Sequence, residues 1–536
     1  MCGIVGYIGD KNCLPTLIDG LRRLEYRGYD SAGVALGVDE KLQLVKAKGK
    51  LSNLEKELSS NNLSANIGIG HTRWATHGVP SKKNAHPHTC CALNIAVVHN
   101  GILENYLELK MELEEGGHRF ESETDTEVLA HLIEENNKNG TSFVQAVEKS
   151  LGRIKGSYAI GVINMSEPDT IVAAKKDSPL VIGYGKGENY LASDIPAILD
   201  KTRQIQILND DEMAILKTGF VKVVKHGEKV DKKIVDVTWD LEAAEKGGFE
   251  DFMLKEMFEQ PKAIKETLRA YIKDDEVDIS STGLSDKKLA SFERIFITAC
   301  GSSFHAAWVG KLAIEEWAKI PVEIEISSEF RYRFPVIEPN TLLLAITQSG
   351  ETADTLAAIR EAKKRGHKVV SITNVLGSTI TRETNGSLVT QAGPEIGVAA
   401  TKTFVTQLIA LYLIALKLAH VKGSLEQEDY KLILGELKKL PEYVEKSLQK
   451  KDEIKKMAEA YHKKPDFLFL GRGFGLPIAL EGALKLKEIS YIHAEGCAAG
   501  EIKHGPIALI DEDCPVVAIA NKSATYAKVR SNIEEV

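Results

Sequence analysis

One pattern occurs twice in the second half of the chain and restricts its fold more than any other feature. An apolar strand, a polar loop with glycine or serine, and a helix follow one another from residue 294, and the same order begins again at residue 466. Uninterrupted apolar strands that alternate with helices are typical of parallel sheets covered on both faces. The sequence therefore predicts two α/β doubly wound parallel-sheet domains, at residues 286–425 and 458–536.

The two copies differ in length. The predicted strands are Arg294–Ala299, Thr341–Ile346 and His367–Thr373 in the first copy, and Asp466–Leu470 and Cys514–Ala520 in the second. The third strand has no counterpart before the sequence stops at Val536. We therefore expect the second domain to be incomplete, with a C-terminal part missing.

The first half has a different pattern. Short β-like runs such as Ile95–Val98 and Ser157–Ile163 are separated by Gly, Asn and Asp, and helical segments such as Cys13–Leu24 lie among them. Strands covered by helices in this way favour a layered α+β domain with stacked sheets at residues 1–240. The charged segment 241–285 predicts a helical linker to the second half.

Composition argues against two classes of partner. The net charge of -8 and the dispersed Lys and Arg residues argue against nucleic acid. The most apolar run, Leu408–Leu416, is far shorter than the roughly 20 residues that span a bilayer, so it predicts a buried helix. No targeting segment follows Met1. These features predict a cytoplasmic protein without a membrane partner.

The seven cysteines include no CxxC pair, which indicates reduced thiols. The vicinal Cys90 and Cys91 could bind a metal, but no second pair stands near them, so we predict neither a metal site nor a cofactor. Cys2 is different, because removal of Met1 would put its thiol and a free α-amine on one residue. That amine has a reference pKa of about 7.7–8.0, so it can activate Cys2 as a nucleophile.

Polar loops of the first half supply the partners that a thiol attacking a carboxamide needs. Asn100 and Gly101, at an expected strand-to-helix turn, can donate to the oxyanion. Arg73 can bind the carboxylate of an amino acid, and Asp125 its ammonium group. A turn or an N-cap would account for each loop taken alone, but together the loops make one chemical set.

The same loops carry a family resemblance, in the segments MCGIVGYIG, LRRLEYRGYDSAG, HTRWATHG, VVHNGILENY and SETDTEV. They resemble the class-II glutamine amidotransferases, whose domain has the N-terminal nucleophile fold. The resemblance implies that Cys2 attacks glutamine and that Asn100 and Gly101 form the oxyanion hole. The residues that it implies for binding glutamine or gating ammonia are Arg73, Trp74, Thr76, His77 and Asp125.

Two loops of the first parallel-sheet copy suit a phosphate, because hydroxyls and backbone N–H groups at helix N-termini attract a dianion. N-caps without a ligand would explain either loop alone. The candidate residues are Ser302, Ser303, Thr347, Gln348, Ser349 and Thr352.

The second copy carries candidates for proton transfer. Lys485 and Glu488 lie three positions apart on one face of a predicted helix, and His504 follows in EIKHGP. A base, a cation and a histidine beside a sugar phosphate would suit an aldose–ketose proton transfer. A surface salt bridge would explain Lys485 and Glu488 equally well.

A second resemblance lies in TQSGETADT, EIGVAATKTF, GRGFGLPIALEGALKLKEISYIHAE and EIKHGP, which resemble the tandem sugar isomerase (SIS) domains of glutamine–fructose-6-phosphate aminotransferases. It implies that L-glutamine and fructose 6-phosphate are the substrates and that ammonia passes internally to give glucosamine 6-phosphate, the first step of hexosamine biosynthesis. It also implies a homodimer. By this resemblance Glu488 moves the proton between C1 and C2, Lys485 assists, and His504 opens the ring.

The chain departs from that family at a few points. Thr347 and Ala400 stand where serine is common. The family's C-terminal tail, whose lysine forms an imine with the open sugar, has no counterpart in the sequence, so we expect no glucosamine 6-phosphate from this chain. A phosphoribosyl amidotransferase or an asparagine synthetase would need motifs that are absent. Another sugar-phosphate amidotransferase, or a sugar-phosphate-binding protein with a retained glutaminase, is the remaining alternative.

Overall fold

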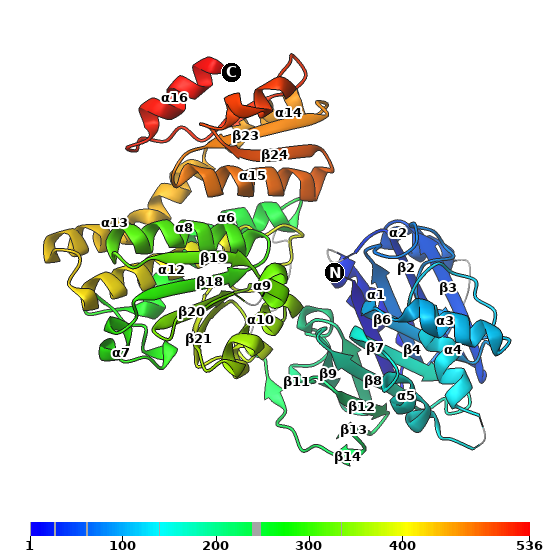
Figure 1. The fold of residues 1–536 in the computed structure, drawn as a ribbon. Coiled ribbons are helices and arrows are strands. Elements are labelled where there is room, and N and C mark those ends of the chain that lie inside the picture. Colours follow the sequence, from blue (N-terminus) through cyan, green and yellow to red (C-terminus); the bar gives the residue numbers. More distant parts are fainter. Residues whose placement is uncertain (1, 26–27, 60–62, 139, 238–247, 334) are drawn as a thin grey trace. The chain divides into compact units, whose positions relative to one another are not determined.

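The computed structural model describes residues 2–25, 28–59, 63–138, 140–237, 248–333 and 335–536. The chain divides into two compact units, Met1–Ala244 (unit 1) and Glu245–Val536 (unit 2), and each has its own elements in Figure 1. The boundary predicted at residue 240 and the first part of the predicted linker, 241–247, lie outside the described residues.

Unit 1 is a sandwich of two antiparallel sheets between two layers of helices (Figure 1). The first sheet has, in spatial order, β15 (Val235–Asp236), β11 (Gln204–Ile207), β9 (Val181–Tyr184), β10 (Glu188–Ala192), β1 (Gly3–Gly9), β4 (Ile67–Arg73), β2 (Ser31–Val38) and β3 (Lys41–Lys48). The second has β14 (Glu228–Lys229), β13 (Phe220–Lys225), β12 (Glu212–Lys217), β8 (Ile171–Lys176), β7 (Gly156–Asn164), β6 (Ile95–Leu103) and β5 (His88–Thr89). The helices are α1 (Cys13–Leu24), α2 (Leu51–Ser59), α3 (Tyr106–Glu115), α4 (Glu127–Asn136) and α5 (Phe143–Leu151).

The apolar strand after Cys2 explains this layering. Ile4 and Ile8 of β1 pack in the core between the two sheets, whereas Val5 and Tyr7 pack in the core beneath α1 and α2. Successive side chains of a strand point to opposite faces, so a strand that is apolar throughout must be covered on both. The predicted α+β sandwich with stacked sheets is therefore confirmed.

The first part of unit 2 is a parallel sheet with helices on both faces. Its strands, in spatial order, are β19 (Val322–Ile326), β18 (Arg294–Ala299), β20 (Thr341–Ile346), β21 (Lys368–Thr373) and β22 (Gly386–Val389). One face packs against α6 (Phe252–Tyr271), α8 (Ser302–Trp317), α12 (Lys402–Lys422) and α13 (Gln427–Leu448), and the other against α9 (Ser327–Arg333) and α10 (Ala353–Lys364). Two short helices complete it, α7 (Asp286–Ala290) and α11 (Thr379–Glu383).

The second parallel sheet repeats this arrangement with three strands, β24 (His493–Ala498), β23 (Asp466–Gly471) and β25 (Val516–Ala518). Ala479 and Ala483 of α15 (Gly475–Ser490) pack on one face of it. The remaining helices are α14 (Lys451–Tyr461) and α16 (Tyr526–Glu535). Two doubly wound parallel-sheet domains are thus confirmed.

The most apolar run of the chain lies inside α12, as a buried helix, as predicted. Among the described residues, α12 is the one helix long and apolar enough to cross a membrane by length and composition. Its apolar side chains pack in the core that it shares with α6 and α8. Burial within unit 2 accounts for this composition.

Candidate active site

Cys2 precedes β1, and its thiol lies beside the loop that follows β4. The backbone N–H of Trp74 lies 3.2 Å from the Cys2 sulfur, and the Cys2 carbonyl oxygen accepts a 2.9 Å hydrogen bond from Nδ2 of Asn100. A Cβ atom on Gly3 would lie 2.5 Å from Oγ1 of Thr72, so β1 is seated tightly against β4 at this point. The structure brings the predicted nucleophile and a predicted oxyanion donor together.

A buried histidine orients the Asn100 amide. Nε2 of His71 lies 3.0 Å from Oδ1 of Asn100 and 3.0 Å from the carbonyl oxygen of His99. Both oxygens are acceptors, so this nitrogen carries the ring proton. Burial lowers the pKa of His71 to about 3, and the ring is neutral at physiological pH. The Oδ1 atom is thereby fixed on His71, and Nδ2 is turned toward Cys2.

Gly101 lies within a strand and not at a turn. β6 continues through Asn100 and Gly101 to Leu103, which corrects the expected strand-to-helix turn at this position. The φ angle of Gly101 is +133°, and a Cβ atom there would lie 2.1 Å from the carbonyl oxygen of Ser157. A side chain at this position is excluded both by the backbone angle and by the neighbouring strand.

Arg73 ends β4 with one donor available to a ligand. Its Nη2 atom donates to the carbonyl oxygens of His77 and Gly78, the second at 3.0 Å. Its Nη1 atom is buried and has no hydrogen-bond partner in the described parts of the chain. Burial lowers the pKa of the guanidinium below its usual range, and the nearby Cys2 and Asp125 oppose that shift. A ligand carboxylate would satisfy Nη1.

Asp125 lies just before α4 and is buried. Its Oδ2 atom accepts a 2.9 Å hydrogen bond from the N–H of Leu103, which fixes the carboxylate against the end of β6. The negative charge of Asp125 opposes the lowering of the Arg73 pKa, which indicates that the two predicted glutamine-binding residues lie in one region.

The other predicted residues of this loop are more exposed. Trp74 is half-buried, and its ring packs edge-on against Tyr29 at 5.4 Å. Thr76 is exposed, and the half-buried His77 packs edge-on against Tyr106 at 5.4 Å. Asp30, directly before β2, fixes this loop. Its Oδ2 atom accepts a 2.8 Å hydrogen bond from the backbone N–H of Ala75.

In unit 2 the predicted phosphate loops lie at the carboxyl ends of β18 and β20, the edge at which parallel sheets bind ligands. Ser302 and Ser303 begin α8, and Oγ of Ser303 accepts a 3.1 Å hydrogen bond from Nε2 of Gln407. The loop after β20 is closed by the hydroxyls of Thr347 and Thr352, 2.7 Å apart. Gln348 and Ser349 of this loop are half-buried.

The second copy contributes charged groups to the first. Nζ of Lys485, on α15, lies 3.0 Å from Oγ of Ser302 and 2.6 Å from Oε2 of Glu488. One turn earlier on α15, Glu481 pairs with His305 of α8 at 2.7 Å. The structure therefore brings Lys485 and Glu488 to one of the predicted phosphate loops.

His504 is not brought to this cluster by any contact. It ends a short 3-10 turn, Ile502–His504, and its side chain is exposed. Among the described residues its ring makes no hydrogen bond or ion pair. Ala400, the position where serine is common, is half-buried before α12.

Sequence reasoning missed three residues that support these sites. His71 stands inside an apolar strand and Gln407 at the start of an apolar helix, and each is a buried polar residue. Such a residue in an apolar pattern is a signal that a specific hydrogen bond is made. Glu481 gives the same signal, because it is buried and stands in the apolar first half of α15.

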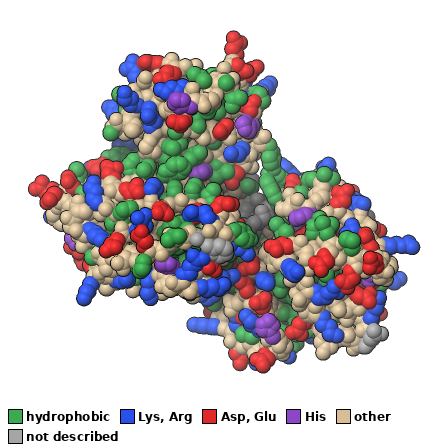
Figure 2. All heavy atoms as spheres, viewed as in Figure 1, with side chains coloured by type: hydrophobic (Ala, Val, Ile, Leu, Met, Phe, Trp, Pro, Cys, Tyr) green, Lys and Arg blue, Asp and Glu red, His purple; other side chains and the backbone are tan. Residues whose placement is uncertain are grey.

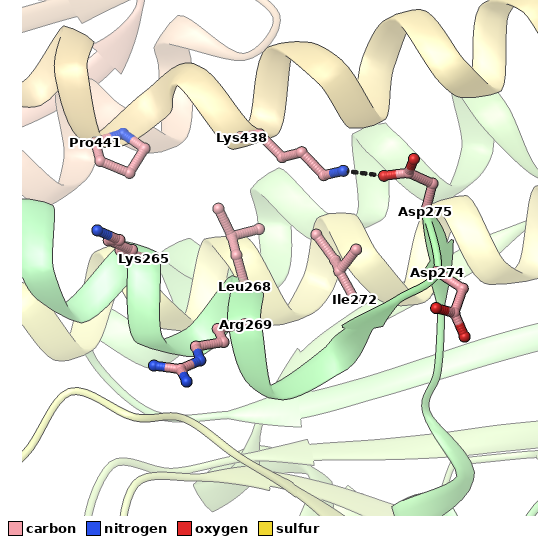
Figure 3. A pocket seen from close by; sticks show the side chains of 8 residues that line it. All are labelled: Lys265, Leu268, Arg269, Ile272, Asp274, Asp275, Lys438 and Pro441. Carbon is pink, nitrogen blue, oxygen red and sulfur yellow. Dashed lines mark hydrogen bonds and ion pairs between the residues drawn. The ribbon is translucent and has the colours of Figure 1, made fainter.

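A groove in unit 2 contains none of the predicted residues. It has a volume of about 420 Å³ and is lined by α6, by α13 and by the turn between β16 (Ile272–Lys273) and β17 (Glu276–Val277) (Figure 3). Lys438 pairs with Asp275 across it, and apolar Leu268 and Ile272 form its floor. The mixture of both charges favours no particular ligand.

Comparisons with known proteins agree with the two kinds of site. Residues 71–200 match the family model of a glutamine amidotransferase domain, and residues 288–417 and 460–536 match that of the SIS domain. Two relatives named isomerizing glutamine–fructose-6-phosphate aminotransferase, from Clostridium tetani and Aquifex aeolicus, are 51% and 52% identical over all of this chain and 88% of their own length. The C-terminal domain of the Francisella tularensis enzyme, a solved structure, is 43% identical with a TM-score of 0.53, over 54% of this chain and 82% of that one.

Proposed function

This chain belongs to the isomerizing glutamine–fructose-6-phosphate aminotransferases, and on that premise we propose which residues carry the family's reaction. The reaction transfers the amide nitrogen of glutamine to fructose 6-phosphate and yields glucosamine 6-phosphate and glutamate. Unit 1 hydrolyses glutamine, and unit 2 binds and isomerises the sugar phosphate.

In unit 1, Cys2 is the nucleophile, activated by its own α-amine, and Asn100 with Gly101 stabilises the oxyanion. The contact between Nδ2 of Asn100 and the Cys2 backbone is the observation that supports this best. Preorganised donors of this kind stabilise charge that develops in the transition state. Arg73 and Asp125 bind the carboxylate and ammonium groups of glutamine, with Thr76, His77 and the ammonia-gating Trp74 around them.

In unit 2, the two hydroxyl-rich loops bind the phosphate, and Glu488 moves a proton between C1 and C2 of the sugar. The 2.6 Å pair with Lys485 supports this role, because Lys485 also contacts Ser302 and so brings the carboxylate to a predicted phosphate loop. His504 opens the sugar ring. The sugar-phosphate residues are Ser302, Ser303, Thr347, Gln348, Ser349 and Thr352.

We also propose a domain division of 1–240, 241–285, 286–425 and 458–536, and a cytoplasmic homodimer. Figure 2 shows Lys and Arg interspersed with Asp and Glu over the visible face, without the single-sign stripe that nucleic-acid binding requires. Burial of the apolar α12 supports the absence of a membrane partner.

The test supplies glutamine and fructose 6-phosphate to the 536-residue chain and measures glutamate and glucosamine 6-phosphate separately. We expect glutamate release, its loss in Cys2→Ala, and retention of fructose 6-phosphate binding by that variant. A wild-type chain that releases no glutamate would contradict the assignment of unit 1. Measurement of glucosamine 6-phosphate in the same assay tests the assignment of unit 2.

A further inference from the structure

Four side chains that could bind a metal converge beside α4, outside the candidate active site. Cys91 follows β5, His118 follows α3, and His131 and Glu134 lie one turn apart on α4. One ligand atom from each lies within 4.8 Å of all the others. The cysteine pair alone did not predict a metal site. The other three residues follow Cys91 by 27 to 43 positions.

The separations match the edges of a tetrahedron around one ion. Nδ1 of His131 lies 3.5 Å from Sγ of Cys91 and 3.3 Å from Nδ1 of His118, which lies 3.9 Å from that sulfur. Oε2 of Glu134 lies 3.1 Å from Nδ1 of His118 and 3.6 Å from Nδ1 of His131. A tetrahedral zinc ion with Zn–N of about 2.0–2.1 Å and Zn–S of about 2.3 Å separates two nitrogens by about 3.3 Å and nitrogen from sulfur by about 3.6 Å.

A carboxylate on the outer side of His118 sets its tautomer, and a second carboxylate faces His131. Nε2 of His118 lies 2.9 Å from Oε2 of Glu135, whereas Nε2 of His131 lies 3.6 Å from Oε1 of Glu127, too far for a hydrogen bond. A carboxylate only accepts hydrogen bonds, so a neutral His118 carries its proton on Nε2 and the lone pair of its Nδ1 points inward, where Nδ1 of His131 lies 3.3 Å away. Outer carboxylates of this kind orient metal-binding histidines.

Backbone groups fix the other two ligands. The N–H of Ala92 donates to Glu134 at 2.8 Å, the N–H of Cys91 donates to it at 3.2 Å, and the N–H of Arg119 lies 3.4 Å from the Cys91 sulfur. Both histidines are buried, whereas Cys91 is exposed and gives an ion access. Hydrogen bonds from outside the cluster thus fix Cys91, His118 and Glu134, and the ring of His131 packs against Phe120 at 4.5 Å.

A proton on His118 is the alternative to a metal ion, because an imidazolium would donate hydrogen bonds to both Glu134 and Glu135. The Cys91 thiol could also donate to Nδ1 of His131 at 3.5 Å, but each such proton joins only two atoms, whereas four ligand atoms converge here. We propose that Cys91, His118, His131 and Glu134 bind one Zn²⁺ ion in a closed tetrahedral site. Sulfur and imidazole ligands favour zinc over Mg²⁺ or Ca²⁺, and the thiolate and carboxylate neutralise its charge.

A closed site with four protein ligands has no position for a reacting water, so the ion is structural. It joins the end of β5 to α4 and to the segment between His118 and His131. That segment carries Asp125.

The test measures zinc in the 536-residue chain, produced in zinc-supplemented medium and purified without chelators. We expect about one zinc ion per chain in the wild type and close to none in Cys91→Ser and His131→Gln, because each loses a ligand. Cys90→Ala is the matched control and should keep its zinc, since the Cys90 thiol donates to Oδ1 of Asn94 at 3.1 Å. Glu135→Gln should bind zinc about 10–100-fold more weakly, the usual cost of losing an outer partner.

A second measurement does not depend on how the variants fold. Co²⁺ added to the reduced, metal-free wild type should give a thiolate-to-cobalt charge-transfer band and the visible bands of a tetrahedral ion. Zn²⁺ should then displace it and raise the melting temperature. A reduced wild type that binds neither ion would overturn the proposal. Equal zinc in the wild type and in both ligand variants would also overturn it, by placing the ion elsewhere.

Discussion

Ser302 and Lys485 lie 183 positions apart in the sequence, and Nζ of Lys485 donates to Oγ of Ser302 at 3.0 Å. The contact joins the first helix turn of one parallel-sheet copy to the last turns of α15 in the other. Fructose 6-phosphate bound at Ser302 would therefore lie within reach of both Lys485 and its partner Glu488.

The first prediction concerns Glu488→Gln, measured in the chain joined to the family's C-terminal tail. The amide cannot accept a carbon-bound proton, so sugar isomerisation should fall at least about 100-fold, the lower end of a general base's contribution. Glutamate release from unit 1 should change less than twofold. Lys487→Gln, on an exposed position of the same helix, is the control and should leave both activities intact. Normal isomerisation by Glu488→Gln would show that the pair of Glu488 with Lys485 is a salt bridge without a catalytic role.

The second prediction concerns Asn100→Ala. Loss of one oxyanion donor should lower kcat for glutamine hydrolysis by about 10²–10³, or about 2.7–4 kcal/mol. His71→Phe should lower kcat in the same direction, because it releases the Asn100 amide, while KM for glutamine changes little in both variants. An Asn100→Ala enzyme with more than a third of wild-type turnover would leave Asn100 without a part in catalysis.

The third prediction concerns Arg73→Lys, which keeps a charge but loses the second donor of the guanidinium. KM for glutamine should rise about 10–100-fold, equivalent to the 1.5–3 kcal/mol of a hydrogen bond to a charged group. Lys82→Gln removes a cation from an exposed ion pair with Glu57 and should leave KM unchanged. An unaltered KM in Arg73→Lys would exclude a contact between Nη1 of Arg73 and the substrate carboxylate.

The fourth prediction concerns the α-amine of Cys2. One extra residue in front of Cys2 would turn that amine into an amide, which is not a base, so glutamine hydrolysis should be lost. Binding of fructose 6-phosphate, followed by its effect on the melting temperature, should persist. Normal hydrolysis by the extended chain would show that another group activates the thiol.

The fifth prediction concerns acid. The pKa of His71 is about 3 in the folded chain and about 6.5 in the unfolded chain, so the unfolded state binds more protons between these values. Stability is therefore complete above about pH 6.5 and falls as the pH drops below it, by about 1.4 kcal/mol per pH unit for each such histidine. His71→Gln should flatten the fall between pH 6.5 and 5 in urea unfolding. His226→Gln, at an exposed position, should not.

Burial lowers the pKa values of His86, His88 and His99 as well, so the acid slope of the wild type exceeds that of one group. The measurement is the difference between His71→Gln and the wild type. Equal slopes would mean that His71 carries a proton in the fold.

The sequence predicted the central strands of both parallel sheets because apolar runs such as Arg294–Ala299 and Thr341–Ile346 are buried on both faces, and the structure has both with the same bounds. The edge strands β19, β22 and β24 were missed. Each pairs along only one side, and each contains charged or polar side chains that interrupt the apolar pattern, such as Glu323 in β19, Ser387 in β22 and Glu495 in β24.

The residues proposed for chemistry were found by sequence because they stand in short, distinctive loops. Residues that orient them were not, because a contact such as His71 with Asn100 depends on which strands pair. The same limit applied to the zinc cluster. Cys91 drew attention as one of a pair, but only the packing of α4 against the end of β5 brings His131 beside it.

The central position of β1 has a consequence for the growing chain. Val5 pairs with Gly70 on one side and with Ala192 on the other. β1 is synthesised first, but it can pair on both sides only after most of unit 1 has been synthesised. Pairings between distant segments form slowly, because the entropy of closing a long loop is lost first. The Cys2 thiol, proposed above as the nucleophile, thus meets its partners only when translation of the sandwich is nearly complete, and we expect unfinished chains to hydrolyse no glutamine.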